Sequence, residues 1–275
     1  MDLDDLDSNL REKYRQLDEL LRGLGSLVVA YSGGVDSGLL AAAAQRALGQ
    51  NMLAVTIRSQ VETPDGVEAA CEAARELGFP HKVVDFDDLV RHQFVDNPPD
   101  RCYLCKLARL GELKKMAHNM GFGAIAEGSN ADDTGDYRPG KKAVLELGVI
   151  SPLAQVGLTK VEIRKLAKAL GLPSWDRPSA PCLATRFPYG TPVSLEGLQQ
   201  IASGEAFLAQ RGYQPVRVRH YGSLARLEVA PEAISRLASE REEIAAYFQS
   251  IGFTHVAVDL VGYRSGSLNE GFVQK

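Results

Sequence analysis

The feature that most constrains this chain is a short apolar run that ends abruptly in two glycines and a hydroxyl-rich turn. It reads Leu27-Val28-Val29-Ala30-Tyr31-Ser32-Gly33-Gly34-Val35-Asp36-Ser37. The apolar, β-branched part is typical of an inner strand that is covered on both faces. Glycines let the backbone take positive φ and bring its N–H groups close to an anion. The segment therefore predicts a buried strand, a phosphate-sized loop and the start of a helix over 38–48.

The loop 32–37 resembles one particular nucleotide-binding motif. Because no lysine follows the two glycines, it is not the P-loop of kinases and GTPases. It resembles, at every position, the Ser-Gly-Gly-x-Asp-Ser PP-loop of the ATP pyrophosphatases. That resemblance implies cleavage of ATP between the α- and β-phosphates, adenylylation of a carbonyl or carboxylate, and release of pyrophosphate. The nucleotide-binding residues that it implies are Ser32, Gly33, Gly34, Asp36 and Ser37.

Strand and helix patterns alternate along the first two thirds of the chain. The runs expected to form strands lie at 27–31, 52–57, 81–86, 123–128 and 150–153. The segments expected to form helices lie at 6–23, 38–48, 63–77, 107–120 and 160–170. This order predicts right-handed βαβ crossovers, and so an α/β fold in which helices cover both faces of a parallel sheet. Ligands of such sheets bind at the carboxyl ends of the strands, where the PP-loop lies.

Composition limits the class of protein. The 275 residues, 45% hydrophobic and 24% charged, suffice for one large or two smaller globular units. No apolar run of about 18 residues predicts a membrane span. The acidic start, Met1-Asp2-Leu3-Asp4-Asp5, differs from the basic start of a signal peptide, so we expect a cytoplasmic protein. The net charge of -4 argues against extended nucleic-acid binding.

The four cysteines point to metal or catalytic use, because a disulfide framework is improbable in the cytoplasm. Cys102-Tyr103-Leu104-Cys105 follows a proline-bounded loop and opens a predicted helix. Two thiols at this spacing are typical of a thioredoxin-like dithiol, half of a zinc site or two ligands of an iron–sulfur cluster. Lys106 is placed to reach a negative group beside them, and the alternative is a solvated lysine on the helix surface.

A polar loop, 129–140, follows the strand that ends at Gly128. Since this strand belongs to the predicted sheet, the carboxylates of the loop are expected near the nucleotide phosphates and their Mg²⁺. We therefore count Gly128 and Asp132 among the nucleotide-binding residues, with Asp36 and Asp132 as candidate Mg²⁺ ligands. An acidic loop that is only solvated is the alternative.

The last part of the chain has a different order of elements. Helices at 194–211 and 231–251 and strands at 213–221, 224–229 and 255–261 predict a small α+β unit with a mixed or antiparallel sheet. We expect a PP-loop domain over 1–186 and a substrate-binding or oligomerisation domain over 187–275. Arg217 and Arg219 lie two apart on a strand and share a face, which suits phosphate capture. A solvated arginine pair is the alternative.

From the PP-loop to Arg217, nearly the whole chain resembles the LarE family. The resemblance is most specific in the segment Cys182-Leu183-Ala184-Thr185-Arg186-Phe187-Pro188-Tyr189-Gly190. LarE proteins are ATP-dependent sulfur transferases of nickel-pincer nucleotide biosynthesis. The resemblance implies that the carboxylates of pyridinium-3,5-biscarboxylate mononucleotide are adenylylated and converted to thiocarboxylates. It also implies that Cys182 bears the sulfur, that Arg186, Arg217 and Arg219 bind the substrate phosphate, and that the chain forms a hexamer.

The two branches of that family differ in their sulfur source. In one branch the cysteine that matches Cys182 gives up its own sulfur; in the other, three cysteines hold a 4Fe-4S cluster that carries an extra sulfide. Because Cys102 and Cys105 accompany Cys182, this chain resembles the second branch, and three thiolates would leave one iron open. Cys71, in a predicted helix, fits a spare buried thiol better than a fourth ligand. The catalytic residues that we expect are Cys182, Asp36 and Lys106.

Three other functions share parts of this pattern. A PP-loop tRNA thiolase can carry a three-cysteine cluster, but it needs a nucleic-acid surface, and this chain is acidic. An amide-forming synthetase of the NAD or GMP synthetase kind shares the PP-loop and needs no cysteine triad. A nucleotide or metal sensor would release no pyrophosphate. We expect a small-molecule nucleotide as substrate and no membrane partner; the sulfide source and the downstream nickel-inserting enzyme are open, as is the role of the tail 264–269.

Overall fold

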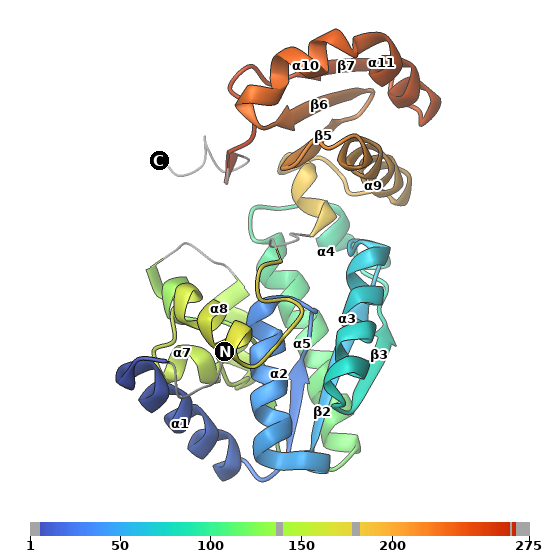
Figure 1. Cartoon of the computed structure of the whole chain (residues 1–275). Coiled ribbons are helices and arrows are strands. Elements are labelled where there is room, and N and C mark those ends of the chain that lie inside the picture. The colour runs from blue at the N-terminus through green and yellow to red at the C-terminus, as the bar shows by residue number, and fades with distance from the viewer. Residues whose placement is uncertain (1–5, 136–139, 178–181, 265, 268–275) are drawn as a thin grey trace. The chain divides into compact units, whose positions relative to one another are not determined.

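The computed structural model divides into two compact units, which Figure 1 shows. It describes residues 6–135, 140–177, 182–264 and 266–267. The first unit comprises Met1–Phe86 and Asp100–Ala180, and the second comprises Asp87–Pro99 and Pro181–Lys275. The boundary expected from the sequence lies after residue 186, whereas these units divide before Pro181 and the second also includes Asp87–Pro99. The roles expected of the two domains stay predictions.

A four-stranded parallel sheet, in the order β3-β2-β1-β4, is the centre of the first unit. Its strands are β1 (Leu27–Ala30), β2 (Met52–Arg58), β3 (His81–Asp85) and β4 (Ala124–Ala126). The strand expected at 150–153 is wrong except at its first residue. Ile150 forms one isolated parallel bridge to Ala126, and helix α7 (Pro152–Gln155) begins directly afterwards. Pro152 lacks the N–H that a longer ladder requires, but it suits the first turn of a helix.

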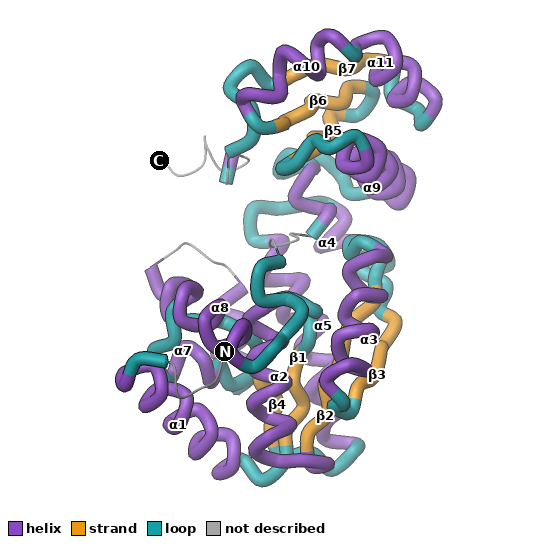
Figure 2. The backbone as a smooth tube through the Cα atoms, viewed as in Figure 1, coloured by secondary structure: helices purple, strands orange, loops and turns teal. Residues whose placement is uncertain are grey.

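Helices cover both faces of this sheet (Figure 2). The other α-helices described in this unit are α1 (Ser8–Gly23), α2 (Val35–Leu48), α3 (Pro64–Leu77), α5 (Arg101–Asn119), α6 (Gly140–Leu147) and α8 (Lys160–Ala169). Side chains alternate along β1: Leu27 and Val29 pack in a core with α1, α2 and α8, whereas Val28 packs in another core with α5 and α6. The predicted α/β fold is therefore confirmed. None of the described helices is long and apolar enough to cross a membrane.

The second unit contains a mixed three-stranded sheet. Its described helices and strands are α4 (His92–Val95), α9 (Leu195–Gln210), β5 (Val216–Tyr221), β6 (Leu224–Val229), α10 (Ile234–Ser239), α11 (Arg241–Ser250) and β7 (His255–Val258). β5 and β6 form an antiparallel hairpin through Gly222-Ser223, and β7 pairs in parallel with β6, so the expected mixed sheet is present. The single helix expected over 231–251 is interrupted at Glu240, whose carboxylate accepts hydrogen bonds from Tyr213 and Arg236.

Candidate active site

The PP-loop connects β1 to the first turn of α2. Gly33 has a φ of +75°, and a Cβ atom on it would lie 2.8 Å from the Ala70 Cβ of α3. Only glycine therefore fits at this position. Gly34 is the N-cap of α2 and offers no side chain to the first N–H groups of the helix. Those N–H groups are available to an anion, whose charge the helix N-terminus also favours.

Hydroxyl groups and a second glycine complete the loop. The Oγ atoms of Ser32 and Ser37 lie 3.1 Å apart, and the Ser32 N–H donates to Ser37 Oγ at 3.2 Å. Gly128, which follows β4, lies directly against this turn, since a Cβ atom on it would be 2.9 Å from the Ser37 nitrogen. The structure thus brings Gly128 to the five residues of the PP-loop motif. Their contacts with nucleotide stay predictions.

Asp36 and Asp132, the expected Mg²⁺ ligands, are both held by Lys160. The Lys160 ammonium forms an ion pair with Asp36, and the Lys160 backbone N–H donates to Asp132 Oδ2 at 2.7 Å. Asn130 also contributes, because its Nδ2 donates to Asp36 Oδ1 at 3.4 Å. Oxygen donors of this kind suit Mg²⁺. The two carboxylates belong to the PP-loop helix and to the polar loop, so Lys160 joins these elements.

Lys106 reaches back to the end of β4. Its ammonium lies 2.9 Å from Glu127 Oε2, and Glu127 also accepts hydrogen bonds from Ser151 Oγ at 2.6 Å and from Ser129. Glu127 is only 6% exposed. Burial alone would raise the pKa of the Glu127 carboxyl, but the charge of Lys106 and these hydrogen bonds lower it below its ordinary value. Since Gly128 follows Glu127, the ammonium is anchored next to the PP-loop.

Cys102 and Cys105 lie in the first turns of α5, because this helix begins at Arg101, earlier than expected. Residues three and four apart share a helix face, so both thiols and Lys106 lie on the same side of α5. Cys102 is exposed, whereas Cys105 and Cys182 are partly exposed. Cys182 belongs to the second unit. The described part of the chain does not bring together three His, Cys, Asp or Glu side chains that could hold a metal ion. The cysteine triad stays a prediction.

Cys182 lies in a tight turn that is fixed by Arg186. The Cys182 carbonyl accepts hydrogen bonds from the Thr185 hydroxyl at 2.7 Å and from Arg186 Nη1 at 3.2 Å. Arg186 is 3% exposed and makes a bidentate ion pair with Glu205 of α9, at 2.8 Å through each nitrogen. The position of Cys182 within the second unit is thus set by a buried arginine.

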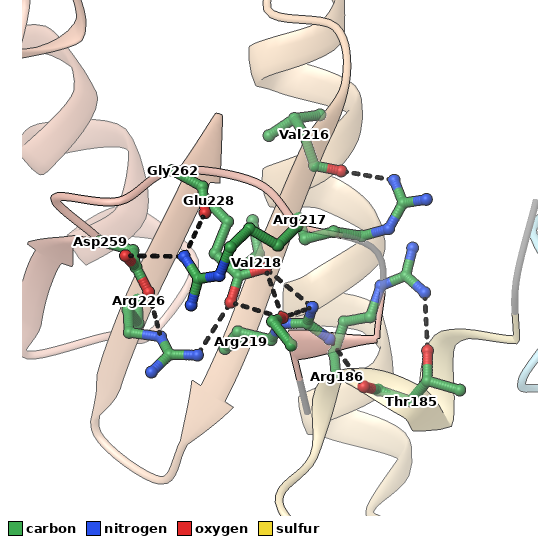
Figure 3. A network of polar contacts seen from close by, with 12 residues as sticks. Thr185, Arg186, Val216, Arg217, Val218, Arg219, Arg226, Glu228, Asp259 and Gly262 are labelled. Atoms are coloured by element: carbon green, nitrogen blue, oxygen red, sulfur yellow. Dashed lines mark hydrogen bonds and ion pairs between the residues drawn. The ribbon is translucent and has the colours of Figure 1, made fainter. Parts of the chain in front are cut away.

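The same turn is connected to the β5–β6 hairpin. Arg219 donates to the Thr185 carbonyl at 2.9 Å and to Glu228 Oε2 at 2.7 Å (Figure 3). Glu228 is fully buried and also accepts from Arg226 at 2.8 Å. Asp259 extends the network at its other end through its ion pair with Arg226. Arg219 is therefore a buried structural cation as well as a candidate phosphate ligand.

Arg217 differs from its two neighbouring arginines. Its described contacts are a hydrogen bond to the Val216 carbonyl at 2.6 Å and a position over the Tyr263 ring, 5.2 Å from the ring centre. No ion pair joins Arg217 to a carboxylate among the described residues. Burial, and then the charge of Arg186, lower the pKa of the Arg217 guanidinium below its ordinary value. A partly desolvated cation of this kind gains most from a bound anion.

Sequence reasoning missed the acidic and basic partners of the site. Glu127 could have been found from the sequence, because a charged residue directly after an apolar strand indicates a functional position. Lys160 could also have been found, because a cation at the first position of a helix is unfavourable for the helix dipole and so indicates another role. Nothing in the sequence distinguishes Glu205 and Glu228 from other glutamates. In the tail 264–269, Ser267 Oγ lies 2.8 Å from Arg219 Nη2, and residues 265, 268 and 269 lie outside the described part.

The fold and the PP-loop define the class: this is an α/β protein of the PP-loop ATP pyrophosphatase type, and ATP is the nucleotide of that class. The profile of the NAD synthase family matches residues 7–110. Over 264 residues, 96% of each chain, the protein is 34% identical to pyridinium-3,5-bisthiocarboxylic acid mononucleotide synthase of Lactiplantibacillus plantarum. The chain belongs to the family of that synthase, the LarE family.

Two further relatives carry no functional name. One is an uncharacterized protein of Synechocystis sp., 41% identical over 263 residues, which are 95% of this chain and 96% of the relative. The other is an uncharacterized protein of Methanocaldococcus jannaschii, 31% identical over 260 residues, which are 94% and 96% of the two chains. All three matches span both compact units, so the relatedness extends beyond the PP-loop domain.

Proposed function

We propose that this chain is an ATP-dependent sulfur transferase that converts the carboxylates of pyridinium-3,5-biscarboxylate mononucleotide to thiocarboxylates. The observation that carries the proposal is the cluster formed by the Cys182 turn, Arg186 and Arg219. It links the residue expected to bear sulfur to the arginines expected to bind the substrate phosphate. The name of the Lactiplantibacillus relative supports the same substrate.

The first half-reaction is adenylylation. A substrate carboxylate oxygen attacks the α-phosphorus of ATP, the bond from that phosphorus to the bridging oxygen breaks, and pyrophosphate leaves. In this proposal the N–H groups of the PP-loop and the hydroxyls of Ser32 and Ser37 stabilise the phosphate charge. Mg²⁺ would be held by Asp36 and Asp132, whose oxygens fit it, and would neutralise charge on the phosphates. Lys106, anchored by Glu127, supplies a further cation at this edge of the sheet.

The second half-reaction transfers sulfur. A sulfur nucleophile attacks the acyl carbon, the bond from that carbon to the AMP oxygen breaks, and AMP leaves with both bonding electrons. Activation is necessary because a free carboxylate is a poor acyl donor, whereas the acyl adenylate carries AMP as a good leaving group. Arg186 fixes the backbone of Cys182, so the sulfur-bearing residue is held in one place.

A 4Fe-4S cluster is the sulfur source that we favour. Cys102 and Cys105 share one face of α5, and together with Cys182 they provide three thiolates, a donor set that fits such a cluster. When bound, it would supply an open iron for an exchangeable sulfide. Sacrifice of the Cys182 sulfur is the alternative, and it leaves the adenylylation half unchanged.

The substrate half of the proposal is tested at Arg217. Arg186 and Arg219 are buried in ion pairs, and removing one partner of such a pair destabilises a protein by about 3–5 kcal/mol. Arg217→Gln avoids that cost. We expect it to raise the KM for the mononucleotide by roughly 10- to 100-fold, as for the loss of one charge-assisted hydrogen bond, with an unchanged KM for ATP. Arg241→Gln, which changes an exposed arginine of α11, is the matched control. Equal substrate affinity of wild type and Arg217→Gln would contradict the assignment.

The sulfur half is tested by reconstitution with iron and sulfide without oxygen, followed by absorption and electron paramagnetic resonance spectra. Cys102→Ala, Cys105→Ala and Cys182→Ala should each lose the cluster signal, and Cys71→Ala should keep it. If only one of the three variants loses the signal, the ligand assignment is wrong. A single turnover that leaves dehydroalanine at position 182 would establish the sacrificial alternative. Turnover with ammonium or glutamine in place of sulfide would favour an amide-forming synthetase, which the NAD synthase match also permits.

The proposal includes the assembly and the location of the protein. A homo-oligomer, with the hexamer that the family suggests, would be measured by light scattering or mass photometry. We also propose a cytoplasmic location, with separate partners that deliver sulfide and accept the product.

A further inference from the structure

Arg109 of α5 contacts a segment that lies outside both the PP-loop and the cysteine motifs. Its Nη1 lies 2.7 Å from Glu62 Oε1, and its Nη2 donates to Ser59 Oγ at 2.5 Å. The Arg109 side chain is 15% exposed, and its guanidinium lies over the Phe86 ring, 5.9 Å from the ring centre. A guanidinium that is held by two acceptors and an aromatic ring has one preferred position, so Arg109 is fixed to this segment.

The segment that Arg109 contacts belongs to the carboxyl edge of the parallel sheet. Ser59 directly follows β2, and the Val61 N–H donates to Ser59 Oγ at 3.4 Å. The Glu62 N–H donates to the Ser59 carbonyl at 3.2 Å, and Val61 is fully buried. The two acceptors of Arg109 are therefore held in a turn that is anchored in the core next to the sheet.

Arg109 and Lys106 attach α5 on the two sides of the strand that carries the PP-loop. In the sheet order β3-β2-β1-β4, β1 lies between β2 and β4. Lys106 pairs with Glu127 directly after β4, and Arg109 pairs with Glu62 after β2. Leu110 of α5 packs in the same core as residues of all three strands. The first half of α5 is therefore held at two points, one on each side of β1.

The thiol pair lies on the same side of α5 as these two cations. Residues three, four and seven apart share a helix face, so Cys102, Cys105, Lys106 and Arg109 form one row along the helix. Arg109 follows Cys105 by four residues, about 6 Å along the helix axis. The contacts of Arg109 therefore fix the position of the Cys105 thiol relative to the carboxyl edge of the sheet.

We propose that Arg109 is a positioning residue for sulfur transfer, which holds the Cys102–Cys105 turn at the carboxyl edge of the sheet through Ser59 and Glu62. This inference rests on the proposed function and adds a residue to its second half-reaction. Without Arg109, the PP-loop still supports adenylylation, but the sulfur-bearing side is misplaced. Water then attacks the acyl carbon, AMP leaves, and the carboxylate is regenerated, so that ATP is consumed without formation of a thiocarboxylate.

The ratio of thiocarboxylate formed to pyrophosphate released tests the proposal. In Arg109→Gln this ratio should fall by roughly 10- to 100-fold, because a displacement of about 1 Å can cost that much in rate, while pyrophosphate release stays within about twofold of wild type. Arg109→Lys keeps the charge but not the fork of two donors, so it should recover part of the ratio. Arg22→Gln, which removes an exposed arginine that pairs with Asp18 of α1, is the control and should keep the ratio.

Alkylation of the metal-free protein gives a second readout that does not depend on activity. Labelling of Cys105 by iodoacetamide, followed by mass spectrometry, should be roughly threefold or more faster in Arg109→Gln, because the turn opens locally more often. Cys71, which is also partly exposed, should be labelled at the wild-type rate. Faster labelling of both cysteines would indicate general unfolding. In that case Glu62→Gln, which removes only the charge of the partner, replaces Arg109→Gln in both measurements.

The outcomes separate this inference from the proposed function. An unchanged ratio and unchanged Cys105 labelling in a folded variant would overturn the inference. An equal loss of pyrophosphate release and thiocarboxylate would also overturn it, because Arg109 would then act in adenylylation. A wild-type chain that releases pyrophosphate but forms no thiocarboxylate would overturn the proposed function, and the labelling of Cys105 would still decide whether Arg109 positions the thiols.

Discussion

At the scale of single residues, the site depends on charges that are held in position by buried partners. Glu127 illustrates this, because its carboxylate is saturated by two serines and the Lys106 ammonium while it is almost fully buried. An interaction network of this kind fixes the position of the lysine nitrogen more tightly than the flexible lysine side chain could by itself. Glu127 is therefore a positioning residue for Lys106.

We expect Glu127→Gln to slow pyrophosphate release by roughly tenfold or more, because an amide no longer holds the ammonium by charge. The KM for ATP should change less than kcat if Lys106 acts mainly in the transition state. Glu146→Gln is the control, since Glu146 is a surface carboxylate that binds Tyr103 and Lys142. Steady-state kinetics test whether Glu127 positions Lys106. A wild-type rate in Glu127→Gln, together with a large loss of rate in Lys106→Met, would show that Lys106 acts without its ion pair to Glu127.

The sequence predicted the residues that carry backbone or family signals better than it predicted their partners. Gly33 and Gly128 could be found because their positions require glycine, and the structure shows the contacts that a Cβ atom would make there. The partners of Arg186 and Arg219 could not be found. Glu205 and Glu228 lie within regular secondary structure, and their burial and pairing follow from tertiary packing. The sequence therefore suggested that Arg186 and Arg219 bind phosphate, whereas the structure shows that both form buried ion pairs with glutamates.

At the scale of secondary-structure elements, hydrophobic periodicity predicted the order of most strands and helices. The wrong predictions concern single strands and helices whose local residues or distant contacts differ from the periodic pattern. Ile150 is apolar and does pair beside β4, but Pro152 starts a helix instead of continuing the ladder. The segment 231–251 has helical periodicity throughout, and its interruption at Glu240 coincides with a hydrogen bond from Tyr213, which lies 27 residues earlier in the chain. α6 was not predicted, because it is only 8 residues long and directly follows a polar loop. Tertiary contacts thus overrule local pattern at element ends.

The β5–β6 hairpin carries a buried histidine that couples its folding to pH. His220 Nε2 lies 2.9 Å from Gln200 Oε1, and its Nδ1 accepts from the Gly222 N–H. The neutral ring therefore satisfies both contacts, and a second proton would oppose the Gly222 N–H. Burial lowers the pKa of His220 below its ordinary value of 6.5, although a hydrogen bond and the charge of Glu196 partly oppose this. Below about pH 6.5 the unfolded chain takes up a proton that the folded chain resists.

Stability of the wild type should therefore fall as pH decreases from 7.5 to 5.5, with a contribution from His220 of at most about 1.4 kcal/mol per pH unit. His220→Gln should reduce this slope, because glutamine does not titrate. His81, whose pKa burial also lowers, contributes to the slope that remains. Denaturant unfolding at several pH values measures the effect. Identical slopes for wild type and His220→Gln would exclude His220 as a source of the pH dependence.

At the scale of the whole molecule, the chain passes between the two units more than once, because 87–99 belongs to the second unit. This arrangement could not be predicted from sequence, since the segment has no periodicity of its own. Its attachment is a set of hydrogen bonds to the segment after Cys182. Asn97 is the centre of that set: its Nδ2 donates to the Pro188 carbonyl at 2.7 Å and to the Thr191 carbonyl at 2.9 Å. The Gly190 N–H donates to the Asn97 carbonyl at 2.8 Å.

Asn97 also has a φ of 52° and is fully buried. Its left-handed backbone and its side-chain hydrogen bonds can therefore contribute separately to the free energy of unfolding, and two substitutions distinguish these contributions. Asn97→Gly tolerates the left-handed backbone but leaves buried carbonyls without their donor, which costs about 1–3 kcal/mol. Asn97→Ala has the same loss and adds about 1–2 kcal/mol of backbone strain. We therefore expect both variants to lower Tm, Asn97→Ala more than Asn97→Gly, and the exposed Asn119→Ala to leave it nearly unchanged.

Hydrogen exchange identifies where the stability is lost. The amides of Gly190 and Val193, which donate to Asn97 and Val95, should exchange faster in both Asn97 variants. Amides of β1 in the first unit should keep their protection, because the altered contacts lie within the second unit. Faster exchange in β1 as well would mean that the two units unfold together, and unchanged exchange at Gly190 would mean that 87–99 is held by other contacts.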